Sequence, residues 1–111
     1  MSNHVFSVSE WLPKPGQEQA LRKIITDLLA HIKRVEPGCL HARVTHQLVH
    51  PGAPTVSKFP IVLLQEYESF EAFDEHCSMD YVKEFFDTYV SDEETRLVED
   101  WRCRLFTEDE I

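Results

Sequence analysis

The stretch LLQEYESFEAFDEHCSMDYVKEF, residues 63–85, changes its hydrophobic period partway along, and this change decides the fold. Its first five residues alternate with the period of two that is typical of a strand. From Phe70 the period becomes helical, because Phe70, Phe73 and Cys77 fall on one stripe of a helix. The stretch therefore predicts a strand that leads directly into its covering helix, and we expect a small-molecule site at that junction.

Alternating and helical patterns continue on both sides of this stretch. The clearest helix covers residues 17–36, and it ends at Pro37 and at Gly38, a glycine that tolerates positive φ. The other elements are predicted as strands over residues 4–12, 39–49, 61–67 and 97–106 and as helices over residues 70–77 and 81–90. This β-α-β-β-α-β order predicts an α+β, ferredoxin-like fold, in which helices cover one face of a four-stranded antiparallel sheet.

The second face of the predicted sheet also carries apolar side chains. Val62 and Leu64 on the third strand, and Val98 and Phe106 on the fourth, take the parity opposite to the face given to the helices. An apolar open face on a small domain suggests burial against a second copy. We therefore expect a homodimer packed sheet against sheet, and the alternative is a monomer whose open face stays apolar.

Length and charge limit the classes of function. The 111 residues suit one domain, 1–111, with an acidic stretch at 107–111 that is expected to fray. Eleven basic and twenty acidic residues give a net charge of −9, which disfavours nucleic acid and anionic membranes as partners. No apolar run is long enough to span a bilayer, and three cysteines without a CxxC pair fit a reducing cytoplasm.

The histidines and cysteines do not follow a metal-binding pattern. His46 and His50 share a strand face, but four strand residues separate them by about 13 Å, which is too far to chelate one ion. Cys39 and His41 stand two residues apart with no third and fourth ligand in view. Neither a metal nor another cofactor is expected.

The chain resembles the antibiotic biosynthesis monooxygenase family, which consists of small dimeric α+β barrel proteins. The family pattern L-Y-E-R-W-E-S-x-E-A-L-x-x-H-x-x-S-x-x-Y-x-x-F lies on residues 63–85 without a gap. The sequence departs from this pattern at Gln65, Glu66 and Tyr67, which take the places of glutamate, arginine and tryptophan. The matching residues are Glu68, Ser69, Glu71, Ala72, His76 and Phe85, and the E-P-G at 36–38 and the K-P-G at 14–16 are also similar to the family.

The resemblance implies a cavity between sheet and helices in each subunit, and oxidation of phenols or quinols by O₂ without metal or flavin. A phenolate can pass one electron to O₂ by itself, so the protein need only bind it, promote its deprotonation and exclude water. Because relatives perform unlike reactions, two other functions stay open. One is a binding or stress-associated module without catalysis, and the other is an isomerase or lyase acting on a small metabolite.

His76 and Tyr67 are the candidate catalytic residues at the strand–helix junction. An imidazole suits a general base or a hydrogen-bond partner of a phenol, although a histidine here could equally close the edge of the core. A tyrosine could hydrogen-bond a substrate oxygen or could fill the core. The residues expected to contact the substrate are Gln65 and Leu63, which share the strand face of Tyr67, together with Phe73 and Trp101.

Overall fold

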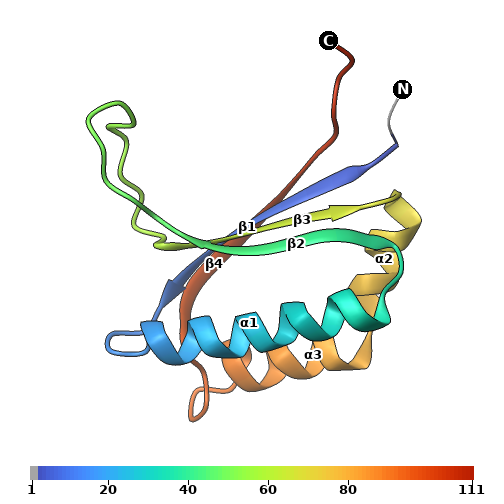
Figure 1. Cartoon of the computed structure of the whole chain (residues 1–111). Coiled ribbons are helices and arrows are strands. Elements are labelled where there is room, and N and C mark those ends of the chain that lie inside the picture. Colours follow the sequence, from blue (N-terminus) through green and yellow to red (C-terminus); the bar gives the residue numbers. More distant parts are fainter. Residues whose placement is uncertain (1–2) are drawn as a thin grey trace.

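The computed structural model describes residues 3–111 and places the helices on one face of a four-stranded sheet (Figure 1). Met1 and Ser2, which the predicted domain 1–111 includes, lie outside the described residues. In chain order the elements are β1 Val5–Pro13, α1 Glu18–Val35, β2 Cys39–His46, β3 Ile61–Tyr67, α2 Phe70–Ser78, α3 Asp80–Phe86, the π-helical turn η1 Asp87–Ser91 and β4 Val98–Phe106.

The strand order explains why both helical segments share one face. The sheet runs β2-β3-β1-β4, and every neighbouring pair is antiparallel. The connection from β1 through α1 to β2 passes over β3, and the connection from β3 through α2 and α3 to β4 passes over β1. This topology confirms the predicted α+β, ferredoxin-like fold.

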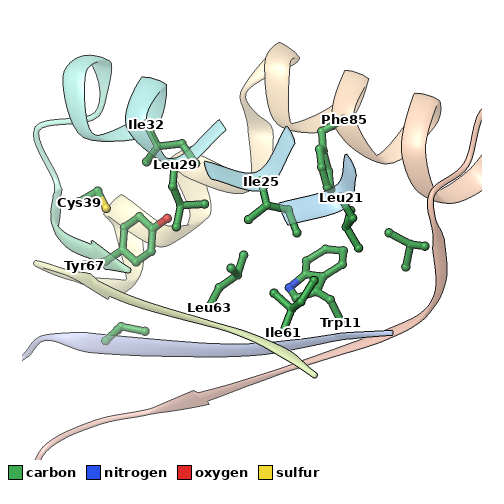
Figure 2. Packing of buried hydrophobic residues seen from close by; sticks show 12 residues of the cluster. Trp11, Leu21, Ile25, Leu29, Ile32, Cys39, Ile61, Leu63, Tyr67 and Phe85 are labelled. Atoms are coloured by element: carbon green, nitrogen blue, oxygen red, sulfur yellow. The ribbon is translucent and has the colours of Figure 1, made fainter. Parts of the chain in front are cut away.

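The core lies between α1 and the central strands. Buried residues alternate with more exposed ones along β1 and β3, as the period of two predicts. Figure 2 shows Tyr67 and Cys39 at one end of this layer, Trp11 at the other and Leu63 between them. The residues of the core cluster are Val5, Trp11, Leu21, Ile25, Leu29, Ile32, Cys39, Ile61, Leu63, Tyr67, Phe85 and Val98.

Two register shifts move Val98 and Cys39 onto the helix-facing side of the sheet. The pairing of β1 with β4 slips between Leu12 and Pro13, and Val98 is only 1% exposed. The prediction that Val98 lies on the open face is therefore wrong, because the irregularity reverses the alternation of side chains. A second shift between Cys39 and His41 places Cys39 in the core, although parity alone groups the two residues on one face.

The segments around α2 also depart from the sequence pattern. Phe70 is 63% exposed, so it does not join the buried stripe predicted for it, whereas Phe73 packs against the core. The predicted helix over residues 81–90 divides into α3 and the wider turn η1. Gly38 does not use positive φ, but a β-carbon added there would meet Ala72 Cβ at 2.6 Å. This glycine therefore lets the start of β2 lie close to α2.

Tyr67 is the largest fully buried side chain among the described residues. Its ring meets Phe73 edge-on at 5.4 Å between centroids, and its hydroxyl accepts a hydrogen bond of 2.8 Å from Gln65 Nε2. Burial raises the pKa of the Tyr67 hydroxyl well above its ordinary value, and the nearby Cys39 and Glu36 act in the same direction. The side chain is therefore a neutral phenol in the folded protein.

The buried hydroxyl of Tyr67 should make stability fall at alkaline pH. In the unfolded chain Tyr67 loses its proton near pH 10.0, whereas the raised pKa keeps the proton in place in the folded chain. The contribution of the Tyr67 hydroxyl to the free energy of unfolding is complete below that pH and is lost as the pH rises above it. Relative to Tyr67→Phe, the wild type should lose about 1.4 kcal/mol of unfolding free energy between about pH 8 and about pH 11. Urea unfolding measures this difference, and a difference that stays constant with pH would contradict the expectation.

Candidate functional site

A cavity of about 370 Å³ lies between the helices and the helix-facing side of the sheet. Residues of α1, α2, α3, β1, β3 and β4 form its wall, so segments far apart in the sequence meet around it. Aromatic side chains close one end. Trp11 stacks on Trp101 at 5.3 Å between ring centroids and meets Phe85 edge-on at 5.7 Å, and Phe86 lies 4.8 Å from Trp101. Flat apolar walls of this kind suit an aromatic ligand.

Small hydroxyl side chains on β1 form the floor of the cavity. Ser7 and Ser9 are buried on the same face of β1 as Val5 and Trp11. Ser9 Oγ accepts a hydrogen bond of 2.9 Å from Trp11 Nε1, and Ser7 Oγ lies 3.3 Å from Cys103 Sγ. Two serines at core-facing positions are too small to fill the layer up to the helices, and this leaves the hollow.

His76 stands at the Tyr67 end of the cavity, where a buried carboxylate holds it. The His76 side chain is 12% exposed, and its Nδ1 lies 3.1 Å from both carboxylate oxygens of Glu36, a side chain that is 5% exposed. The hydroxyl of Tyr81 donates a hydrogen bond to the same carboxylate. The ring of Tyr67 lies 5.2 Å from the ring of His76. Glu36, His76 and Tyr81 are named the Glu36 cluster below.

Three helix ends bring the Glu36 cluster together. Glu36 is the C-cap of α1, and its N–H donates to the carbonyl of Ile32 at 2.9 Å. The helix α2 starts after Ser69, whose hydroxyl caps the first turn, and it carries His76 in its last turn. Tyr81 lies in the first turn of α3. Each helix thus contributes one polar group at the end that lies near Glu36.

The Glu36 cluster determines which nitrogen of His76 remains as a hydrogen-bond acceptor. A carboxylate only accepts hydrogen bonds, so Nδ1 carries the proton that points to Glu36. In a neutral imidazole Nε2 is then the acceptor nitrogen of His76. Burial and the hydrogen bond to Glu36 raise the pKa of Tyr81, so this hydroxyl remains a donor. His76 is therefore placed to accept a proton from a hydroxyl group in the cavity.

The structure gathers most of the predicted site residues and separates one of them. The predicted site residues that line the cavity are His76, Gln65, Leu63, Phe73 and Trp101. Tyr67 does not line the cavity. It lies in the core, and its hydroxyl accepts a hydrogen bond from Gln65. A neutral buried phenol cannot act as a base, so this geometry favours core packing for Tyr67. The roles proposed for the lining residues remain predictions.

Sequence patterns do not single out Glu36 or Tyr81 as site residues. Glu36 can nevertheless be found from its spacing, because it continues the buried stripe of α1 four residues after Ile32. An acidic side chain at a buried position needs a hydrogen-bond partner. Ser7 and Ser9 carry a similar signal, because they take the core-facing parity of β1. Tyr81 carries none, since its partner lies 45 residues away in the chain.

Within residues 3–111, no group of three or more His, Cys, Asp or Glu side chains is arranged to hold a metal ion. Across the same residues, every helix is too short or too polar to cross a membrane.

Solved structures share this fold. A protein from Shewanella oneidensis has a TM-score of 0.71 at 24% identity, over 96% of this chain and 91% of that chain. A Caulobacter crescentus protein assigned to the antibiotic biosynthesis monooxygenases has a TM-score of 0.75 at 21% identity, with coverages of 98% and 92%. Hydroxynitrile lyase from Passiflora edulis reaches 0.80 at 12% identity, with coverages of 100% and 98%. At these identities the likeness shows the fold alone. Proteins named for different activities share this fold, so the fold does not define the chemistry.

Comparison at the level of sequence gives the family. No curated protein matches the chain. The family model described as antibiotic biosynthesis monooxygenase matches residues 4–88, which include the strand–helix junction, Glu36, His76 and most of the cavity wall. The chain therefore belongs to the antibiotic biosynthesis monooxygenase family.

Proposed function

We propose that the chain is a cofactor-independent monooxygenase that oxidises a small aromatic phenol or quinol with O₂. The observation that carries the proposal is the position of His76 in the wall of an apolar cavity, with its Nδ1 engaged by Glu36. The cavity volume of about 370 Å³ suits a small-molecule ligand, and family membership supports the same class of role. A phenol would place its ring against the aromatic wall and its hydroxyl at His76.

Deprotonation by His76 starts the proposed reaction. Nε2 takes the hydroxyl proton, and the imidazolium that forms is paired with Glu36 while the phenolate remains in apolar surroundings. The phenolate passes one electron to O₂, and the two radicals combine at a ring carbon to give a peroxide anion. This anion takes the proton back from His76, and the hydroperoxide that forms then loses water. One oxygen atom ends in a new ring carbonyl and the other in water, so a phenol and O₂ yield a quinone and water. No further reductant is needed.

Gln65 supplies a second polar contact for the ligand. Its Nε2 donates to the hydroxyl of Tyr67, which fixes the orientation of the amide and leaves Oε1 as an acceptor. Gln65 lines the cavity from β3, opposite the helices. In this arrangement Tyr67 orients Gln65 and does not contact the ligand itself. Phe73 and Trp101 contact the aromatic ring of the ligand.

The proposal includes a homodimer formed through the open face of the sheet. Alternation along the strands places Val62 and Leu64 on the face without helices, and Phe106 lies on the same face at the β4 edge. Leu64 and Phe106 are 39% and 46% exposed. Burial of this face against a second copy would remove its apolar area from water.

Oxygen-dependent turnover tests the proposed activity. We expect hydroquinones or naphthols incubated under ¹⁸O₂ to give quinones that carry the label, and we expect His76→Ala to slow turnover about 100-fold because the base is lost. His46→Ala is the matched control, since His46 is exposed and lies outside the cavity wall. Its activity should equal that of the wild type.

Two outcomes of this experiment would contradict the proposal. Binding without turnover would favour a non-catalytic binding module. Turnover that is equally fast without O₂ would favour a lyase or isomerase, and the fold shared with hydroxynitrile lyase makes this the second candidate.

Sedimentation analysis tests the homodimer. The wild type should have twice the 13.0 kDa mass of one chain. Leu64→Asp should shift the protein to the monomer, because it would bury an unpaired charge in an apolar interface. Thr26→Asp, on the exposed side of α1, should leave the dimer intact. A wild-type mass equal to that of one chain would rule out the proposed sheet-to-sheet dimer.

A further inference from the structure

We propose that Glu36 makes the cavity select aromatic ligands with a neutral hydroxyl group over aromatic ligands that carry a carboxylate. The inference rests on the proposed function for the place of the ligand beside His76, but it concerns binding and needs no turnover. Glu36 is 5% exposed and lies directly behind His76, which is part of the cavity wall. A buried charge at this place must affect which ligands can enter.

Few charges surround the cavity. Among the described residues, Lys83 and Asp87 are the formally charged side chains in its wall besides the titratable His76. Both are exposed and lie one helical turn apart, so solvent screens them and their opposite charges largely cancel. The charge that remains in the interior belongs to Glu36. It is balanced by hydrogen bonds from His76 and Tyr81 rather than by a permanent cation.

A neutral hydroxyl completes this arrangement without adding charge. The ligand would donate to Nε2 of His76, and Nδ1 of His76 already donates to Glu36. The hydrogen bonds then run in one direction, from ligand to imidazole to carboxylate, and each donor has an acceptor. Tyr81 supplies the second donor to Glu36 from α3.

A carboxylate meets two obstacles at the same place. It has no proton to donate, so it would face Nε2 of a neutral His76 as one acceptor against another. His76 would first have to take a proton from solvent, and the ligand would still bring a second negative charge into apolar space near Glu36. Carboxylate binding should therefore be weaker and should consume a proton, whereas binding of a neutral phenol should consume none.

Calorimetric titration of the wild type with 1-naphthol and 1-naphthoate tests the selection. The two ligands share one ring system and differ in the group presented to His76. We expect 1-naphthol to bind about tenfold more tightly, an effect of about 1.4 kcal/mol. In two buffers of different ionisation enthalpy, 1-naphthoate should take up about one proton per site and 1-naphthol none.

Two variants assign the selection to the charge of Glu36. Glu36→Gln keeps the size of the side chain and an oxygen acceptor but removes the charge, so the preference should fall several-fold through tighter binding of 1-naphthoate. Tyr81→Phe removes a donor and keeps the charge, so the preference for 1-naphthol should persist. Circular dichroism checks that both variants fold. If Glu36→Gln does not fold, the proton uptake of the wild type on binding 1-naphthoate still tests the proposal.

Four results would overturn the proposal. They are 1-naphthoate binding as tightly as 1-naphthol, 1-naphthoate binding without proton uptake, an unchanged preference in Glu36→Gln, and no binding of 1-naphthol at all. The proposed oxidation can fail separately. A cavity that selects 1-naphthol but never oxidises any phenol under O₂ would contradict the oxidation and leave the role of Glu36 intact.

Discussion

A buried carboxylate that accepts hydrogen bonds from two other helices is the interaction on which the site depends. Glu36 ends α1 inside the protein rather than at its surface, and the donors that satisfy it come from α2 and α3. Removing either donor would leave a charge poorly compensated in the interior. This requirement fixes the ends of three helices relative to one another. It also engages Nδ1 of His76, which leaves Nε2 as the acceptor nitrogen of a residue that lines the cavity.

Packing around Glu36 serves the same arrangement. Gly38 lies against Ala72 with no room for a β-carbon, so the chain can turn from α1 into β2 close beside α2. The small side chains of Ser7 and Ser9 leave space above β1. The stacked indoles of Trp11 and Trp101 close the end of the cavity that lies away from His76. The cavity therefore has a polar end and an aromatic end, which is the shape that a phenol presents.

The sequence allowed the fold to be predicted well, because strand and helix periods are local. Residues 61–67 match the observed β3, and the β-α-β-β-α-β order follows from such patterns. Local patterns put Val98 on the wrong face, because a register shift depends on the pairing of distant strands, which no local period records. Five of the six predicted site residues line one cavity, but no local pattern identifies Glu36 and Tyr81 as site residues. Their importance arises from contacts across 40 and 45 residues of chain.

The proposed chemistry requires that Glu36 binds Nδ1–H of His76 and that Nε2 is the acceptor for a ligand in the cavity. Nitrogen NMR of ¹⁵N-histidine-labelled protein tests this claim directly, since the two neutral tautomers of imidazole give different patterns of ¹⁵N shifts and couplings. Neutral His76 should carry its proton on Nδ1, and its Nε2 resonance should move when a phenol is added. A neutral His76 with the proton on Nε2, or an Nε2 resonance that ignores the ligand, would contradict it.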